Sequence, residues 1–344
     1  MSSAQPLSAV LEQLLEGRAL SEEEACALLQ RLTAPDLDPV LAGALLTAVR
    51  AKGLTGIELR GFARGMRALA RKPELPAGPA AVDIVGTGGD RSGSLNLSTG
   101  AALVTAAAGQ RVIKHGNRSV SSQAGSADVL EALGLKLPLD EIAAGRCLAA
   151  CGFTFLFAPH YHPAMKAIAP VRRALGVRTV FNILGPLSNP AEPPFHVIGA
   201  YSLATAHLMA DALAGMNIRR AFVIHGCDGW DEPTPVGPFD LLEVHEGRVR
   251  YERRSPADFG LATCAAADLA GSDAAGNAAA LRAVLSGTDR GAHRDALLLG
   301  AALALEVTGA ESSPRAAMAR AAAAIDSGAA VALLGTLARF RQSA

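Results

Sequence analysis

The sequence is poor in charged and aromatic residues. Of its 344 residues, 19% are charged and 4% are aromatic, and Lys+Arg and Asp+Glu balance at 32 each, so the formal net charge is zero. Proteins that bind nucleic acid nonspecifically carry a large basic excess, which is absent here. Half of the residues are hydrophobic. This is enough apolar side chain to form a core, which excludes a wholly disordered protein.

Cysteines and long apolar runs are also scarce. The 5 cysteines form no CxxC pair and are too sparse for a disulfide framework. The longest apolar run, Leu297–Leu305, has about half of the roughly 18 residues that a membrane span needs. The first residues lack the basic start and apolar segment of a secretory signal. We therefore expect a cytoplasmic protein with no membrane partner and no nucleic-acid partner.

The pattern of apolar residues changes near residue 72. Residues 1–72 contain only helical patterns, including a capping box at Ser21 and Glu24 and helices that begin near Pro39 and Ile57. Prolines mark residues 73–79 as a linker. Short apolar strands then alternate with helices, and a hairpin surrounds Glu246-Gly247. This alternation predicts an α/β fold: a small all-helical domain plus a large α/β domain with a mostly parallel central sheet.

The first predicted strand ends in a loop of glycine and hydroxyl residues, 86–99. Glycines allow backbone N–H groups to approach a phosphate, and the hydroxyls add donors. The loop lacks the Gly-Lys-Ser/Thr of a P-loop and the GxGxxG spacing of a dinucleotide site. It therefore predicts an anion site of another kind, with a turn that binds nothing as the alternative.

Two further polar loops follow predicted strands. Residues Lys114–Ser122 contain two cations, an amide and hydroxyls that together suit a polyanion, and Ser126 then begins a helix whose free N–H groups favour an anion. Residues His225–Glu232 contain three carboxylates, which suit Mg²⁺ when phosphate oxygens and water complete its shell. A solvated turn is the alternative for each loop.

Taken together, these motifs resemble those of the anthranilate phosphoribosyltransferases. The resemblance implies a homodimer that uses Mg²⁺ and transfers the phosphoribosyl group of 5-phosphoribosyl 1-diphosphate (PRPP) to the amine of anthranilate. Pyrophosphate is released, and the reaction belongs to tryptophan biosynthesis. The motifs follow one another over nearly the whole chain: Gly86–Asp90, Asn96–Thr99, Lys114–Arg118, Gly125–Asp128, His162–Ala164, Pro170–Arg172, Arg178–Asn182, Gly185–Leu187 and Asp231–Glu232.

The resemblance also implies domain boundaries and a dimer surface. The helical domain takes residues 1–72 and a helical segment around 170–192, and the α/β domain takes 80–169 and 193–344, with 73–79 as linker. The predicted helix from Pro39 carries a wide apolar stripe, formed by Leu41, Leu45, Leu46 and Val49. We expect these helices to pack against the helix near Arg172 and to supply the homodimer surface.

Site residues carry over motif by motif. The resemblance implies that Ser98, Asp231 and Glu232 serve the metal, and that Gly86, Asn117 and Arg172 hold anthranilate, with Arg172 pairing with its carboxylate. No catalytic residue is assigned, although His115 is a candidate for moving the amine proton, with a structural or substrate-wall role as the alternative. PRPP would be held by Gly86, Gly89, Asp90, Ser94, Asn96, Leu97, Ser98, Thr99, Lys114, His115, Gly116, Asn117, Arg118, Ser119, Val120, Ser121, Ser122 and Ser126.

The sequence departs from the family pattern at two places, and two other functions stay open. Arg91 stands where the family usually has glycine, and Pro233-Thr234 replaces an aliphatic residue and a hydroxyl. Both departures bear on rate or loop mobility more than on reaction type. A pyrimidine nucleoside phosphorylase shares the architecture but leaves Arg172 without a purpose. A non-catalytic nucleic-acid-binding relative is disfavoured by the zero net charge and the Asp231-Glu232 pair.

Overall fold

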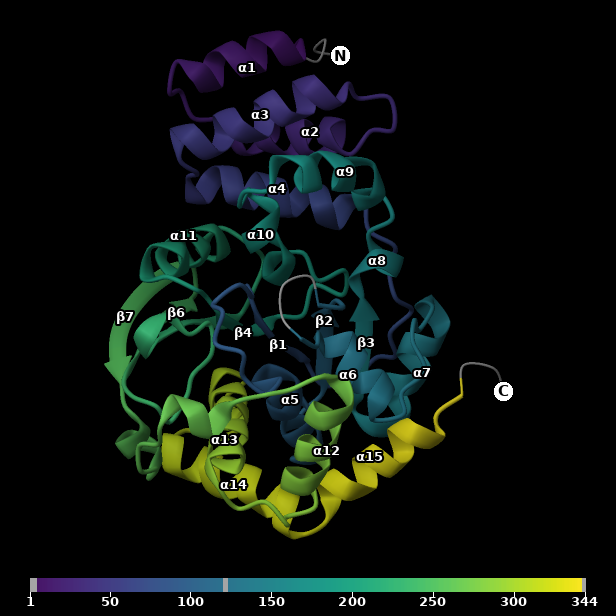
Figure 1. The fold of residues 1–344 in the computed structure, drawn as a ribbon, viewed down its shortest axis with the longest axis vertical. Helices are drawn as coiled ribbons and strands as arrows, with labels where there is room; N and C mark the ends of the chain where they lie inside the picture. The colour runs from purple at the N-terminus through teal and green to yellow at the C-terminus, as the bar shows by residue number, and fades with distance from the viewer. Residues whose placement is uncertain (1–4, 120–122, 342–344) are drawn as a thin grey trace.

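The computed structural model describes residues 5–119 and 123–341. A bundle of helices stands at one end of a larger part that is built around a seven-stranded sheet (Figure 1). The helix that carries Arg172 joins the bundle although it lies far along the chain. The bundle contains α1 (Leu7–Leu15), α2 (Glu22–Leu32), α3 (Pro39–Lys52), α4 (Gly56–Ala68) and α9 (Met165–Leu175).

The sheet is parallel except at one edge. Its order is β3-β2-β1-β4-β5-β6-β7, and β6 and β7 are antiparallel to their neighbours. The predicted parallel sheet and its appended hairpin around Glu246-Gly247 are both confirmed. The strands are β1 (Val82–Gly86), β2 (Val112–Gly116), β3 (Phe153–Phe157), β4 (Phe195–Gly199), β5 (Arg220–Gly226), β6 (Phe239–His245) and β7 (Arg248–Arg254).

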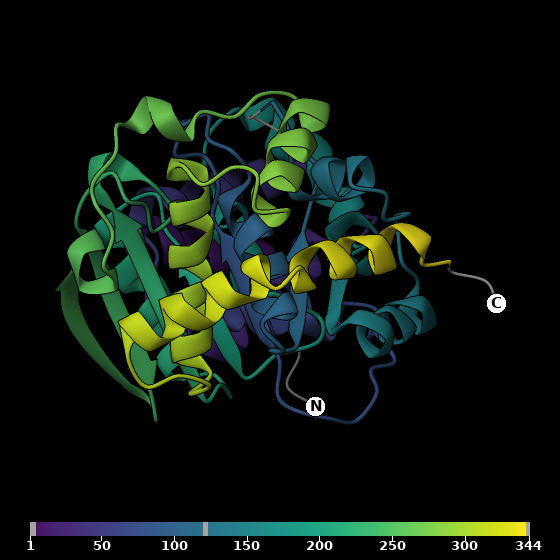
Figure 2. The ribbon, with the colours of Figure 1, turned by 90° about the horizontal axis from the view of Figure 1, so that it is seen from below.

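Helices cover both faces of this sheet (Figure 2). On β5, Phe222 and Ile224 face one apolar core while Ala221 and Val223 face the other, as the two-residue period of a strand requires. The short helix α10 (Phe181–Leu184) contacts α4 of the bundle. The helices of the sheet part are α5 (Leu97–Ala107), α6 (Ser126–Ala132), α7 (Glu141–Cys151), α8 (Ala158–Tyr161), α11 (Leu203–Ala214), α12 (Ala274–Leu285), α13 (Ala292–Val307), α14 (Pro314–Asp326) and α15 (Ala329–Arg339).

The second core continues from the sheet into the helical bundle. It joins the apolar side chains of α2, α3 and α4 to those of α11 and of strands β4–β6. Helix α3 packs on α9, where Gly43 leaves room for Val171 and Leu175. The expected packing of the N-terminal helices against the helix near Arg172 is thus confirmed. Because the core is continuous, the bundle is held firmly over one end of the sheet.

Short-range signals account for most helix boundaries. Ser21 Oγ accepts a hydrogen bond from Glu24 N at 3.2 Å, and the Glu24 carboxylate accepts one from Ser21 N at 2.7 Å, so the predicted capping box is present. Helix α3 begins at Pro39 and ends at Gly53, which has φ of 87°. Helix α1 is not among the helices predicted individually, because Pro6 precedes it and no side chain caps it.

Two predicted absences concern membrane spans and disulfides. Within the described residues, no single helix is long and apolar enough to cross a membrane; α14 and α15 pass that test only as a pair, which is bent by 60°. All 5 cysteines lie in this part of the chain and are free thiols.

Candidate active site

The carboxyl ends of the neighbouring strands β1 and β4 form a crevice, the strand-end crevice. The strand order reverses at β1, which has β2 on one side and β4 on the other, and ligands of open α/β sheets bind at such points. Both strands end in glycine, and the Asp231 segment crosses them. A Cβ atom on Gly199 would lie 1.6 Å from the Asp231 carbonyl oxygen, and one on Gly86 would lie 2.5 Å from Asp231 Oδ2. Only glycine at both strand ends lets Asp231 approach this closely.

Asp231 holds the glycine-rich loop, residues 86–93, against the strand ends. Its Oδ2 atom accepts hydrogen bonds from Gly88 N and, at 3.4 Å, from Thr87 Oγ1. Its own N–H group donates to Asp90 Oδ2 at 3.5 Å. Burial raises the pKa of Asp231 well above its usual range, and the nearby charges of Glu232 and Asp90 add to the effect.

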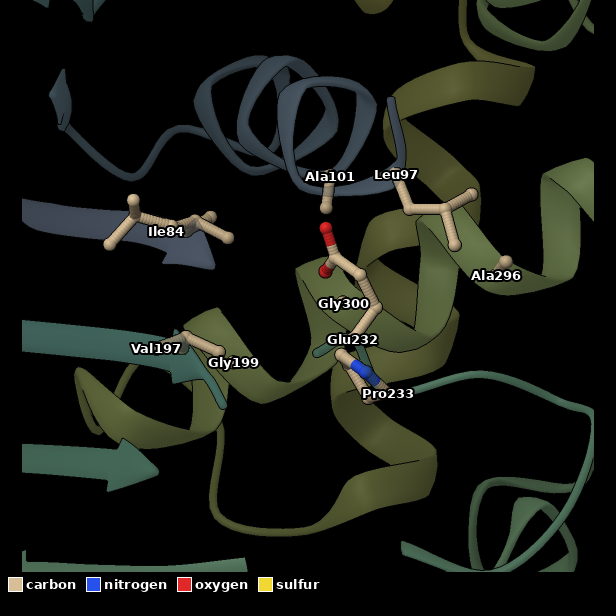
Figure 3. Close-up of a pocket in the computed structure, with 10 residues that line it drawn as sticks. Ile84, Leu97, Ala101, Val197, Gly199, Glu232, Pro233, Ala296 and Gly300 are labelled. Carbon is tan, nitrogen blue, oxygen red and sulfur yellow. The ribbon is translucent and has the colours of Figure 1, made fainter. Parts of the chain in front are cut away.

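Glu232 points from the same segment toward the start of α5. Its carboxylate lies between Ile84 of β1 and Ala101 of α5 (Figure 3), and Oε1 accepts a hydrogen bond from Ser98 N at 3.2 Å. Burial raises the pKa of Glu232 to about 7, although the charge of Lys114 opposes the shift. The predicted metal residues Ser98, Asp231 and Glu232 are therefore brought to one place.

Lys114 is the internal cation of this region and is only 1% exposed. Its Nζ atom donates to the Ile84 carbonyl oxygen and, at 3.3 Å, to Ser98 Oγ. Asp83 is fully buried beside it and accepts hydrogen bonds from His115 N at 3.2 Å and Asn189 Nδ2 at 2.8 Å. Burial raises the pKa of Asp83 to about 6 and lowers that of Lys114, and the charge of each partner opposes the shift of the other.

The charges of this cluster favour a bound cation. Lys114 interacts with Asp83 and Glu232, while Glu232 and Asp90 act on Asp231, and burial raises the pKa of Asp83, Asp231 and Glu232. No group of three or more His, Cys, Asp or Glu side chains with metal-binding geometry occurs in the described part of the chain. Mg²⁺ needs only one or two protein carboxylates when phosphate oxygens and water complete its shell, so Asp231 and Glu232 fit this ion.

The second predicted loop, after β2, is only partly described. Arg118 pairs with Asp128 at 2.9 Å and with Glu131 at 2.6 Å, so two carboxylates of α6 already balance its charge. Ser126 Oγ donates to the Asn117 carbonyl oxygen at 3.2 Å. A Cβ atom on Gly116 would meet Ser126 Oγ, and Ser119 N donates to Asp128 Oδ2 at 3.1 Å. The predicted PRPP residues Val120, Ser121 and Ser122 lie outside the described residues.

The remaining predicted PRPP residues line the glycine-rich loop and the start of α5. Asn96 donates to the Ala124 carbonyl oxygen at 3.0 Å and accepts from Asn277 Nδ2 at 2.9 Å, so this amide braces the loop that follows β2. Leu97 is buried beside Glu232. Ser94 Oγ accepts a hydrogen bond from Ser92 Oγ at 3.2 Å, Thr99 has a buried hydroxyl with no partner among the described residues, and Gly89 lies beside Arg178.

Arg91, one of the two departures from the family pattern, lies in this loop with φ of 63°. Most residues other than glycine and asparagine adopt this left-handed region only at a cost in free energy. The glycine that the family usually has here therefore suits the backbone of the loop better than arginine does.

His115 is buried and poorly suited to move protons. Its Nδ1 atom lies 3.2 Å from the Gly185 carbonyl oxygen, which can only accept, so Nδ1 carries the hydrogen. The ring packs edge-on against His162 with 5.1 Å between centroids. Burial lowers the pKa of His115 to about 3, which makes its free Nε2 atom a very weak base.

Arg172 presents a guanidinium group with no anionic partner. The group lies over the Phe181 ring, 5.0 Å from its centroid. Across residues 5–119 and 123–341 it makes no hydrogen bond or ion pair, and no contact joins it to Gly86 or Asn117, the other residues predicted for anthranilate. Partial burial lowers its pKa. A half-buried, unpaired arginine that is held by a ring is suited to receive a carboxylate.

Several residues that shape the site have no role predicted from the sequence. Gly199 and Thr87 seat the Asp231 segment, Asp83 and Asn189 support Lys114 and β2, and Arg178 contacts Gly89. A glycine at the end of a strand is the one local signal that could have pointed to Gly199. The others depend on which strands become neighbours.

Buried histidines make the stability of this region sensitive to acid, and His196 on β4 gives the clearest test. Burial lowers the pKa of His196 to about 3, and the charge of Arg67 adds to this. As pH falls below about 6.5, the unfolded chain gains a proton at this position and the folded chain does not, so folding loses free energy. We expect His196→Gln to gain roughly 1–2 kcal/mol relative to the parent chain between pH 6.5 and pH 5. Urea unfolding at both pH values measures this; a stability difference independent of pH contradicts the assignment.

Comparison with known proteins shows the class of this fold and site. The family model described as "Glycosyl transferase family, a/b domain" matches residues 78–331, and the one described as "Glycosyl transferase family, helical bundle domain" matches residues 8–70. The bundle and the sheet thus correspond to the two domains of this glycosyl transferase family.

Full-length relatives define the family more closely. An anthranilate phosphoribosyltransferase of Moorella thermoacetica is 46% identical over 337 residues, which are 98% of this chain and 99% of that protein. The crystal structure of the Thermus thermophilus enzyme of that name has a TM-score of 0.90 at 41% identity and covers 96% of this chain and 98% of that chain. The Saccharomyces cerevisiae enzyme, solved in complex with PRPP and Mg, has a TM-score of 0.88 at 27% identity, with 96% of both chains covered. The chain belongs to the anthranilate phosphoribosyltransferase family.

Proposed function

We propose that this chain transfers the phosphoribosyl group of PRPP to the amine of anthranilate, giving N-(5-phosphoribosyl)anthranilate and pyrophosphate in tryptophan biosynthesis. The observation that carries the proposal is the Asp231-Glu232 pair. It is seated on two glycine strand ends beside a glycine-rich loop, and the charge of Lys114 offsets that of its carboxylates only in part, since their pKa values stay raised. Such a site suits a substrate that brings both phosphate and a divalent cation.

Mg²⁺ is the cation that Asp231, Glu232 and Ser98 would hold. Bound there, it would neutralise the pyrophosphate leaving group. The yeast relative, solved with PRPP and Mg, supports this assignment. The backbone of residues 86–93 and the start of α5 would supply N–H donors to the same phosphates, as glycine-rich loops at helix N-termini do.

The reaction forms a bond between the anthranilate nitrogen and ribose C1, breaks the bond from C1 to the pyrophosphate oxygen, and moves one proton from the amine to the released pyrophosphate or to solvent. Most of what it demands is positioning and charge stabilisation. An aromatic amine is already neutral near pH 7, so a strong general base is not required. The low pKa of His115 agrees with this, and we assign that ring to the wall of the site. Arg172 would bind the anthranilate carboxylate and thereby set the register of the amine.

The assignment of PRPP residues follows the described geometry. Gly86 ends β1, Gly89 and Asp90 lie in the loop that follows it, and Asn96 and Ser98 stand at the start of α5. We propose that the residues after β2, Lys114 to Ser126, complete the site from its other side. Lys114 acts there as the internal cation of the cluster, because its Nζ atom is enclosed by Ile84 and Ser98. A pyrimidine nucleoside phosphorylase would leave the Arg172 guanidinium without a purpose, and nucleic-acid binding is disfavoured by the zero net charge and the Asp231-Glu232 pair.

The experiment that tests this function follows the fluorescence of anthranilate in the presence of PRPP and Mg²⁺. The fluorescence should decay only when both are added. Replacing PRPP by a pyrimidine nucleoside and inorganic phosphate should give no turnover. Turnover of the nucleoside but not of anthranilate would overturn the proposal in favour of the phosphorylase.

We further propose that the chain divides at residues 73–79 and forms a homodimer through the outer face of the bundle. Residues 1–72 and the segment around 170–192 would form the helical domain, with 80–169 and 193–344 as the α/β domain. Leu45, Leu46 and Val49 of the predicted apolar stripe are buried in the core of the chain, so the stripe itself is not this surface. The proposal rests instead on two exposed apolar side chains of the bundle: Val40 of α3 is 81% exposed and Leu15 of α1 is 66% exposed. A second copy would bury them, and exposed apolar patches commonly mark such interfaces.

Light scattering at micromolar concentration tests this dimer. We expect twice the chain mass of 35.1 kDa, and we expect the combined Leu15→Glu and Val40→Glu substitutions to give the monomer because a charge would be buried at the interface. Val331→Glu, at a 46% exposed position on α15 far from the bundle, is the matched control and should remain dimeric. A monomeric parent chain contradicts the proposal.

A further inference from the structure

Arg178 links the helical bundle to the glycine-rich loop. It lies in the short connection between α9 and α10, six positions after Arg172 in the sequence. Its Nη2 atom donates a hydrogen bond to the Gly89 carbonyl oxygen, and its guanidinium carbon lies 3.9 Å from the centroid of the Tyr201 ring. The side chain therefore stacks on one loop of the sheet and bonds to another.

The backbone of Arg178 is fixed from the side of the bundle. Its carbonyl oxygen accepts a hydrogen bond from Arg50 Nη1 of α3 at 2.8 Å. The next residue, Thr179, donates its N–H group to Asn182 Oδ1 at 2.9 Å. The backbone of the connection between α9 and α10 is thus held by hydrogen bonds to α3 and α10, which fix where the Arg178 side chain begins.

The two partners of Arg178 belong to the strand-end crevice. Tyr201 N donates to Thr87 Oγ1 at 3.2 Å, and Thr87 N donates to the Gly199 carbonyl oxygen at 2.9 Å. Gly89 has φ of 80°, and a Cβ atom there would lie 3.1 Å from Arg178 Nη2. Glycine at this position therefore serves both the left-handed backbone and the close approach of the arginine.

The charge of Arg178 and the glycine content of residues 86–93 indicate what the contact between them does. Arg178 makes no ion pair with any described residue, so its side chain is not held by a carboxylate. The loop contains four glycines, and ordering such a flexible segment around a ligand costs entropy. A contact that orders the loop beforehand reduces that cost.

We propose that Arg178 is a positioning residue that latches the segment carrying Arg172 onto the glycine-rich loop and so pre-forms the loop for the pyrophosphate of PRPP. The inference rests on the proposed function for the identity of the ligand. Arg178 would then connect the two substrate subsites. The same segment of chain carries Arg172, which is assigned to anthranilate, and Arg178, which contacts the loop assigned to PRPP.

The test uses two measurements that do not depend on turnover. Hydrogen exchange of residues 86–93 reports the order of the loop in the substrate-free chain. Calorimetric titration with PRPP and Mg²⁺, without anthranilate, reports binding. In Arg178→Ala we expect faster exchange in this segment and PRPP binding at least tenfold weaker, because a charge-assisted hydrogen bond alone accounts for about tenfold or more and a cation–π contact is lost with it.

Conservative and control variants separate a latch from a general loss of charge. Arg178→Lys keeps a donor but loses the planar stack on Tyr201, so its exchange rate and PRPP affinity should lie between those of Arg178→Ala and the parent. Tyr201→Leu should weaken PRPP binding in the parent and have little further effect in Arg178→Ala. Arg173→Ala removes an exposed arginine that makes no hydrogen bond or ion pair with the described residues, and should match the parent.

Each outcome decides one claim. Unchanged exchange in Arg178→Ala overturns the latch, including the case in which PRPP binding weakens, because the arginine would then act by charge alone. Unchanged PRPP affinity with faster exchange overturns the role of the latch in binding. If the parent chain does not turn over PRPP and anthranilate but loop exchange responds to Arg178, the proposed function fails and the contact with the loop stands.

Discussion

Replacing Asp231 by Asn together with Glu232 by Gln is expected to abolish turnover and to leave the chain folded. The two carboxylates are placed at the strand ends by Gly86 and Gly199, and their raised pKa values reflect burial and mutual repulsion. Amides of nearly the same shape remove that repulsion but give up the negative charge that would hold Mg²⁺ against pyrophosphate. The side-chain amide oxygen introduced by Asp231→Asn would still be able to accept the hydrogen bond of Gly88, so the loop should keep its position.

The measurement is the rate of anthranilate consumption at limiting Mg²⁺, with thermal unfolding as a check of folding. Asp228→Asn is the matched control. Asp228 is the third carboxylate of the same segment, but it is exposed and has φ of 58°, a conformation that asparagine also accepts. It should retain the parent rate. A double variant that is folded and nearly as fast as the parent would remove the metal assignment.

Arg172→Ala is expected to raise the KM for anthranilate strongly and to change the affinity for PRPP little. The guanidinium is held over Phe181 and makes no ion pair with the described residues. The carboxylate of a bound substrate would therefore supply the anionic partner that these residues do not. Losing a charge-assisted hydrogen bond costs about 1.5–3 kcal/mol, which is about 10- to 150-fold in affinity. Arg172→Lys keeps the charge without the two-donor fork and should fall between the two.

Parallel titrations with anthranilate and PRPP distinguish this role from a general defect. Arg173→Ala, the neighbouring exposed arginine, is the control and should alter neither value. Lys114→Ala is a poor comparison for PRPP binding, because Lys114 also balances buried Asp83 and its loss should destabilise the fold. Weaker PRPP binding with an unchanged KM for anthranilate in Arg172→Ala would contradict the assignment of Arg172 to anthranilate and would assign it to PRPP.

Much of the fold could be predicted because its signals are short-range. The Ser21–Glu24 capping box, Pro39 at a helix start and the alternation of strands and helices each involve residues a few positions apart. Helix α1 has no such signal, because its start has no capping side chain. The alternation predicts a mostly parallel sheet, whereas the order of its seven strands, with β1 between β2 and β4, is a tertiary property that the sequence analysis did not predict.

The candidate site could be predicted as motifs but not as a geometry. The sequence places Asp231 and Glu232 next to each other, whereas the closeness of Gly86 and Gly199 to Asp231 arises from the pairing of β1 with β4. The sequence predicts Lys114 as a phosphate ligand because it begins a polar loop. In the structure it lies on β2 beside β1, and its Nζ atom is enclosed there. Arg118 likewise finds its carboxylates on α6, ten and thirteen positions away, which spacing in a loop does not indicate.

The most direct test of the account is the identity and stoichiometry of the products. The purified chain is incubated with PRPP, anthranilate and Mg²⁺, and the products are followed by mass spectrometry together with a pyrophosphate assay. We expect N-(5-phosphoribosyl)anthranilate and pyrophosphate in equal amounts, and neither product from the Asp231→Asn, Glu232→Gln variant. Pyrophosphate release without the anthranilate adduct, or no consumption of PRPP by a folded parent chain, would contradict the account.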